Sequence, residues 1–237
     1  MIALNDIAQF LDYFFGVDSF GDDQNGVYIL STRPIKRLGL ALEPWTGLRQ
    51  WANTEKLDAV FLHRPWQLQP EQLAADIGVL AYHLAFDENL TLGFNPRLAT
   101  VLGMSTLEVL GKKQERSLGM IGNIPSQSNA GFCAYVDDVF GGYDKAIVDD
   151  EREISRVAVV GAMNDALVRE AADRGADVYI TGQLRQPAQA AVQETGISIV
   201  AVGHRRSEEW GLRALAGVLR DRWSRLEVIL PNCDTIS

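Results

Sequence analysis

The chain has little cysteine and no long apolar run. Its 237 residues include two cysteines, Cys133 and Cys233, whose spacing matches no metal-binding or redox motif. No apolar run approaches the roughly 20 residues that are needed to cross a bilayer. The first residues lack the basic start and the apolar stretch of a secretory signal. These absences predict a cytoplasmic protein whose thiols are reduced.

Basic runs are also missing from the sequence. The formal net charge is −9, and an acidic chain of this kind is a poor partner for nucleic acid or for an anionic membrane. We therefore expect neither partner. Apolar residues, in contrast, make up 47% of the chain, which is ample for the core of one large domain or of two small ones.

All three histidines lie at the ends of apolar segments. His83 stands four residues before Asp87, and His204 stands four residues before Glu208, while His63 directly follows a buried segment. Side chains that follow a buried strand emerge at the rim of a sheet, where α/β proteins build their sites. Imidazole and carboxylate ligands together suit a divalent transition metal such as Zn, Fe, Mn, Co or Ni. The alternative is three unrelated histidines at strand ends.

The second half of the chain repeats the order of elements in the first half. Residues 37–42 match residues 156–161, and residues 57–62 match residues 176–181, in both cases 119 positions later. Each segment is typical of a short buried strand, and a helical pattern follows the first strand of each half. A further helix and strand then lead to the His-x3-acid pattern. The repeat predicts a duplicated α/β fold, with two similar three-layer subdomains that have mixed sheets.

The predicted boundary between the two halves lies near residue 110. Residues 1–110 form the first half, which carries the first two histidines, and residues 111–237 form the second half, which carries the third. The C-terminal segment of the second half is free to pack on the first. Residues 118–124 contain two glycines and are closed by Pro125, so we expect them to form at best an edge strand.

Five short segments, in order over most of the chain, resemble the motifs of one known family. They are Asp23-Gln24-Asn25-Gly26-Val27, Leu62-His63-Arg64-Pro65, His83 to Asp87, Ala176 to Gly182, and Gly203 to Gly211. The family is the NGG-interacting-factor-like family of dinuclear-metal proteins, which are also named type 2 homologues of GTP cyclohydrolase 1. No single segment is specific, and the resemblance depends on their shared order.

The resemblance implies two related α/β domains in a toroidal homohexamer with a metal site that faces an internal cavity. Carried over position by position, it implies that His63, Asp87, His204 and Glu208 are ligands of one or two divalent ions. His83 is then either a fifth ligand or a residue that orients a ligand, and its apolar neighbours favour the second role.

Arg64 departs from the family pattern, which has a second consecutive histidine at this position. A guanidinium has a fixed positive charge and no free lone pair, so it cannot replace an imidazole as a metal ligand. If Arg64 points into the site, it repels a second cation, and the chain then holds one ion or binds a second one weakly. The alternative is that Arg64 turns toward solvent.

Two classes of function remain open. The first is a metal-dependent hydrolase for a small, phosphate-bearing, heterocyclic or nucleotide-like substrate, in which the ion polarises the substrate and lowers the pKa of water toward about 7. Glu208, or a second carboxylate, would then accept a proton, and Arg64 could hold an anionic group. GTP cyclohydrolase activity enters only through the resemblance. The second class is a non-catalytic metal-binding or scaffolding hexamer, and a decayed site that binds no ion is a further possibility.

Overall fold

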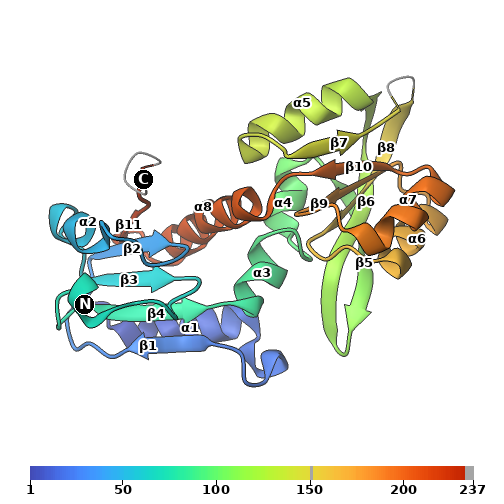
Figure 1. Ribbon diagram of the computed structural model, residues 1–237. Coiled ribbons are helices and arrows are strands. Elements are labelled where there is room, and N and C mark those ends of the chain that lie inside the picture. The colour runs from blue at the N-terminus through green and yellow to red at the C-terminus, as the bar shows by residue number, and fades with distance from the viewer. Residues whose placement is uncertain (150–151, 233–237) are drawn as a thin grey trace. The chain divides into compact units, whose positions relative to one another are not determined.

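The computed structural model describes residues 1–149 and 152–232, which divide into two compact units (Figure 1). The first unit is Met1–Phe86 together with the described residues from Leu212 onward, and the second is Asp87–Gly211. The division falls within two helices, α3 (Leu84–Leu90) and α8 (His204–Arg222). Residues 87–110, which the sequence placed in the first half, belong to the second unit because α4 packs against the first strand of its sheet.

The first unit is built on a five-stranded sheet in the order β1-β4-β3-β2-β11. Its strands are β1 (Asn25–Ile29), β2 (Arg37–Ala41), β3 (Ala59–Leu62), β4 (Gly78–Tyr82) and β11 (Glu227–Ile229). All are parallel except β1, which pairs with β4 in the antiparallel sense. Helix α1 (Leu4–Phe15) packs on one face of the sheet, and α2 (Leu48–Thr54) packs on the other against Val60 and Leu62. The unit therefore has three layers.

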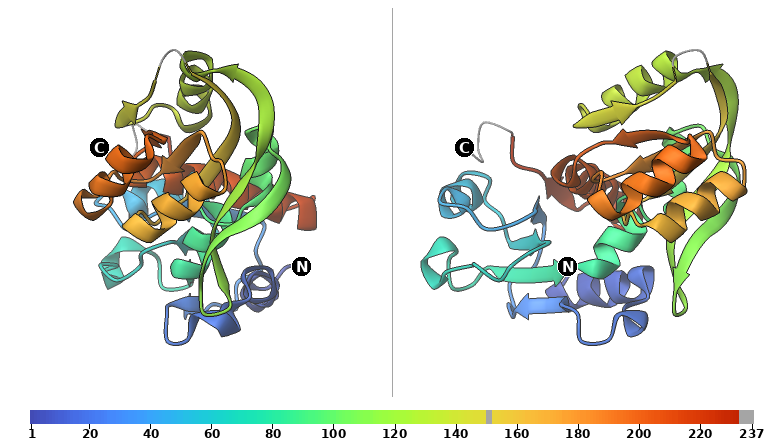
Figure 2. Two further views of the ribbon diagram at one scale, coloured as in Figure 1. Left: turned by 90° about the vertical axis from the view of Figure 1, so that its right-hand side faces the viewer. Right: turned by 45° about the vertical axis from the view of Figure 1, so that its right-hand side comes forward.

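The second unit is built on a six-stranded sheet in the order β5-β6-β8-β9-β10-β7. Its strands are β5 (Ser105–Lys113), β6 (Arg116–Ser128), β7 (Lys145–Ile147), β8 (Glu153–Val160), β9 (Val178–Thr181) and β10 (Ser198–Ala201). Its remaining helices are α4 (Pro96–Val101), α5 (Asn129–Phe140), α6 (Asp165–Asp173) and α7 (Gln189–Thr195). Helices α6 and α7 lie side by side over one apolar core (Figure 2). Helix α5 packs on β6 and β8.

The prediction of an edge strand at residues 118–124 is wrong. These residues belong to β6, which pairs with β5 on one side and with β8 on the other. Pro125 has no N–H to donate, but it falls between Asn123 and Gln127, where the pairing with β8 shifts its register. An irregularity of this kind accommodates a proline within a sheet.

The two units repeat one arrangement of strands. The order β1-β4-β3-β2 in the first unit corresponds to β7-β10-β9-β8 in the second, and in both a single antiparallel strand borders three parallel ones. The duplicated α/β fold that the sequence predicted is therefore confirmed. It also extends further than predicted, because α1 precedes β1 as α5 precedes β7.

One hydrogen-bond pattern recurs at the offset of 119 residues. Asp58 Oδ2 accepts the backbone N–H of Arg37 at 3.0 Å, and Asp177 Oδ2 accepts that of Arg156 at 2.9 Å. Each carboxylate also accepts the N–H of the residue before the arginine. The Nε of each arginine donates to a backbone carbonyl near the end of the next helix. Two of the few identities between the halves therefore perform the same structural task.

The structure bears on two other expectations. In the described part of the chain, no helix is both long and apolar enough to span a bilayer. Of the two cysteines, Cys133 is buried in α5, and Cys233 lies outside the described residues.

Candidate metal centre

His63 follows β3 directly and is fully buried. Its Nδ1 lies 2.9 Å from the backbone carbonyl oxygen of Tyr82, at the end of the neighbouring strand β4. A carbonyl oxygen only accepts hydrogen bonds, so Nδ1 must carry the hydrogen. In the neutral imidazole the lone pair is then at Nε2, and an imidazole that is oriented in this way is ready to bind a metal.

His83 follows β4 directly and is held by an aspartate from a distant segment. Its Nδ1 lies 3.0 Å from Asp23 Oδ1, and Asp23 Oδ2 accepts the backbone N–H of Leu84 at 2.7 Å. One carboxylate therefore orients the imidazole and also binds the start of α3. Because an ionised carboxylate only accepts, the neutral His83 ring keeps its lone pair at Nε2. Carboxylates that orient metal-binding histidines in this way are common in metalloproteins.

Asp87 completes a group of three possible ligands. It lies one helical turn after His83 in α3, and one ligand atom from each of His63, His83 and Asp87 lies within 4.8 Å of the others. Two ligands of a single ion at about 2.1 Å are at most about 4.2 Å apart. A shift of less than about 1 Å therefore brings all three atoms within coordination distance. Among residues 1–149 and 152–232 this is the only such group.

Aromatic side chains surround the two imidazoles. The ring of His63 lies 4.8 Å from that of Phe86 and 5.3 Å from that of His83, measured between centroids. Trp66 packs edge-on against His83 at 4.9 Å and is itself 53% exposed. This packing restricts the orientation of both rings and excludes water from one side of the group.

Tyr82, the last residue of β4, anchors the end of this strand to helix α1. Its hydroxyl donates to Asp12 Oδ1, at 2.7 Å, and lies 2.9 Å from the carbonyl oxygen of Ala8 in α1. Burial, reinforced by the hydrogen bond and the negative charge of Asp12, raises the pKa of Tyr82 far above its ordinary value. The hydroxyl therefore stays protonated, and α1 holds in place the strand whose last carbonyl orients His63.

His204 and Glu208 form the second predicted pair and belong to the second unit. His204 begins α8 shortly after β10, and its Nε2 lies 3.0 Å from Glu208 Oε1, one turn further along the helix. The His204 side chain is 64% exposed, whereas that of Glu208 is 1% exposed. The two side chains of this pair are therefore in contact. That the pair shares an ion with His63 and Asp87 stays a prediction.

Arg64 lies next to a carboxylate at the end of β3. Its Nε is 3.5 Å from Glu43 Oε2, and its side chain is 23% exposed. The guanidinium is thus neither fully buried nor simply turned into solvent. Its proposed effect on a second cation stays a prediction.

The sequence left His83 open as a fifth ligand or an orienting residue, and it did not indicate Asp23 as the partner of His83. The structure places His83 among the possible ligands, with Asp23 behind it. The segment that contains Asp23 was visible as a motif, but no local spacing rule connects residues 60 positions apart. The antiparallel pairing of Asn25 with Tyr82 brings them together.

These features define a class of protein, a duplicated α/β protein with imidazoles and carboxylates at the ends of its parallel strands. The family model of Duf34/NIF3 (NGG1p interacting factor 3) matches residues 2–235, and the chain belongs to this family. The resemblance that its motifs suggested is thereby confirmed.

Relatives and solved structures agree with this assignment. The chain is 34% identical over 207 residues to the GTP cyclohydrolase 1 type 2 homolog of Neisseria meningitidis serogroup B, with 81% of this chain and 82% of that protein covered. It is 26% identical over 249 residues to the Pseudomonas aeruginosa protein of the same name, with 98% of each covered. The Staphylococcus aureus hypothetical protein SA1388 has the same fold, with a TM-score of 0.79 at 16% identity over 99% of this chain and 98% of that one.

Proposed function

We propose that this protein binds a divalent transition metal through His63, His83 and Asp87 and uses it to hydrolyse a small substrate. The observation that carries the proposal is the convergence of three ligand atoms within 4.8 Å, with Nδ1 of both imidazoles held by oxygen atoms. We include His204 and Glu208, as the sequence predicts, as further ligands from the second unit.

The donor set suits the proposed ion. Two imidazoles and a carboxylate favour Zn, Fe, Mn, Co or Ni over Mg or Ca, which prefer oxygen ligands alone. When bound, such an ion supplies Lewis acidity and lowers the pKa of water toward about 7. We propose that one ion is held tightly and that a second ion is absent or weakly bound. The reason is that Arg64 stands where the motif of the family has a histidine.

The remaining roles fall to side chains of this chain. Glu208 is our proposed proton acceptor, since its carboxylate is buried and its imidazole neighbour is 3.0 Å away. Arg64 is proposed to hold an anionic group of the substrate, because a guanidinium binds carboxylate and phosphate through charge-assisted hydrogen bonds. Trp66 and Phe86 exclude water from the side of the imidazoles that they cover.

The substrate class and the assembly are proposed on the names and motifs of relatives. Several relatives carry the name GTP cyclohydrolase 1 type 2 homolog, so nucleotides and related heterocycles are the first substrates to test. We further propose a homohexamer, as the family resemblance implies. We also propose that it is located in the cytoplasm without nucleic-acid or membrane partners, as the sequence predicts. The mass of the protein in solution tests the hexamer directly.

Metal analysis and a substrate screen test the proposal in sequence. Elemental analysis of freshly purified protein should give about one transition-metal ion per chain, and two tightly held ions would contradict the role of Arg64. Metal-loaded protein is then screened on nucleotides, phosphoesters and cyclic amides. Turnover that chelation abolishes and metal restores supports the hydrolase. Bound metal without any turnover would leave the non-catalytic hexamer as the function.

A further inference from the structure

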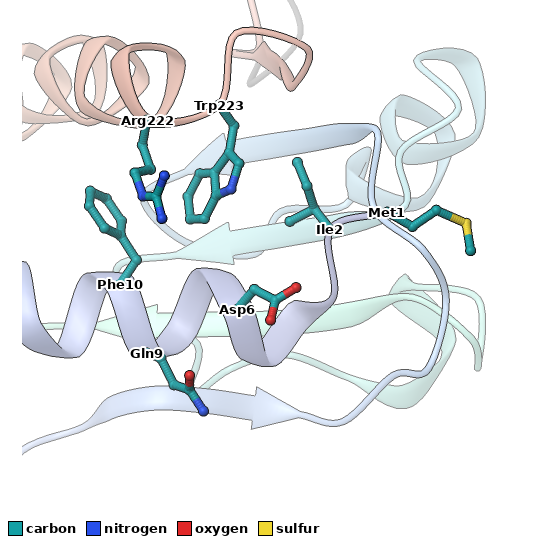
Figure 3. A pocket seen from close by; sticks show the side chains of 7 residues that line it. All are labelled: Met1, Ile2, Asp6, Gln9, Phe10, Arg222 and Trp223. Carbon is teal, nitrogen blue, oxygen red and sulfur yellow. The ribbon is translucent and has the colours of Figure 1, made fainter.

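A pocket in the first unit lies at the opposite end of the parallel strands from the histidines. It has a volume of about 420 Å³ and is lined by the start of α1 and the end of α8 (Figure 3). Ile2, in its wall, pairs with Ile35 just before β2 begins, whereas His63 and His83 follow the ends of β3 and β4. Because these strands are parallel, the pocket and the candidate metal centre are at opposite ends of them.

Arg222 and two aromatic rings form the centre of this pocket. The guanidinium carbon of Arg222 lies 5.9 Å from the centroid of Phe10 and 5.3 Å from that of Trp223, and the two rings meet edge to face at 5.1 Å. These contacts hold the guanidinium plane by cation–π attraction. Within the described residues, no side chain or carbonyl accepts a hydrogen bond from Arg222. Its donors are therefore available to a ligand.

The opposite wall limits the charge that the pocket accepts. Asp6 projects from α1 into the pocket, and its Oδ2 accepts the backbone N–H of Ala3 at 2.8 Å (Figure 3). This fixed carboxylate repels a multiply charged anion such as a phosphate ester more strongly than a single carboxylate. The apolar surfaces of Ile2, Phe10 and Trp223 favour a flat hydrocarbon ring. The volume falls within the range of small-molecule sites.

We propose that this pocket binds a small planar aromatic carboxylate. The carboxylate accepts two hydrogen bonds from the guanidinium of Arg222, and the ring packs against Phe10 and Trp223. This site does not depend on the proposed hydrolase, because it lies at the opposite end of the parallel strands and uses none of the candidate metal ligands.

Calorimetric titration of the purified full-length protein with 2-naphthoate tests the proposal. We expect saturable binding with a Kd of about 1 mM or below. The matched neutral probe, 2-naphthamide, keeps the rings but lacks the charge, and it should bind at least about 10-fold more weakly. Equal binding of both probes, or no binding of 2-naphthoate up to about 10 mM, would overturn the proposal.

Variants show whether the binding occurs in this pocket. Arg222→Met should raise the Kd for 2-naphthoate at least about 10-fold, and Arg222→Lys, which keeps the charge without the planar fork, should fall between it and the wild type. Arg225→Met is the control, because it removes a neighbouring exposed arginine that does not line the pocket. An unchanged Kd for Arg222→Met, with its Tm equal to that of the wild type, would refute the site. All variants should keep the metal content of the wild type.

Discussion

His83 in the first unit and His204 in the second both open a His-x3-acid turn after a buried parallel strand, yet their surroundings differ. The side chain of His83 is 26% exposed and is held by Asp23, whereas that of His204 is 64% exposed and contacts the glutamate of its own turn. Gene duplication therefore explains where the two histidines stand. It does not explain how their rings are oriented, because that depends on partners outside the repeated pattern.

The neighbours of the two turns show how the units diverged. Gly182 stands 119 residues after His63 and packs beside His204, so the second unit has no imidazole at the position of His63. Asp144 precedes β7 much as Asp23 precedes β1, but it accepts a hydrogen bond from Arg206 at 2.6 Å. The first unit therefore contains an oriented pair of imidazoles, whereas the second contains the single imidazole of His204 and the buried carboxylate of Glu208.

The largest expected effect comes from removing an imidazole of the first unit. Loss of an outer partner of a metal ligand typically costs 10–100-fold in affinity, so we expect His63→Ala to weaken metal binding by more than about 100-fold. His204→Ala should cost less, because its ring is more exposed. Metal competition with a chromogenic chelator measures both. Equal losses of metal affinity in the two variants would contradict the expected difference between the two units.

The second prediction compares the two aspartates that precede the edge strands. Asp23→Asn keeps the shape but loses the charge that orients His83, and metal affinity should fall about 10- to 100-fold. Asp144→Asn is its matched control in the second unit and should change the affinity by less than about 3-fold. The same competition assay applies. A larger effect of Asp144→Asn would show that the second unit orients the ion.

The third prediction concerns the part of the repeat that did not diverge. Asp58→Ala and Asp177→Ala each leave two backbone N–H groups without their carboxylate acceptor. Each should lower the free energy of unfolding by about 1–3 kcal/mol, and the two values should be similar. Urea denaturation measures both changes. A large effect at one site alone would mean that the shared pattern stabilises only one unit.

The smallest expected effect concerns Glu108, which accepts a hydrogen bond from Arg156, an arginine of the recurring hydrogen-bond pattern. Arg156 hydrogen-bonds to Glu108, and this contact, followed by that of Arg174, holds the pKa of Glu108 below its ordinary value of 4.5. The stabilisation is therefore present above that value and is lost as the pH falls through the lower pKa of the folded protein. The Tm difference between wild type and Glu108→Gln should be small at pH 7 and should shrink toward zero in acid. A difference that grows in acid would contradict the lowered pKa.

Much of the fold could be predicted from the sequence because its signals are local. Buried strands such as residues 59–62 are continuous apolar runs, and the constant offset between the halves revealed the duplication. The interior position of β6 could not be read in this way. Its glycines and Pro125 indicate an edge, and only the pairing partners on both sides, with a register shift at the proline, show otherwise.

For the candidate site, too, some features could be predicted from the sequence and others could not. The sequence by itself determined which residue types stand at the strand ends, and it placed Asp87 and Glu208 one turn after a histidine, because that spacing belongs to any helix. Only the tertiary structure decided that His63 and His83 lie side by side and that Asp23 orients one of them. Those contacts join residues 20 and 60 positions apart, and the pairing of neighbouring strands brings such residues together.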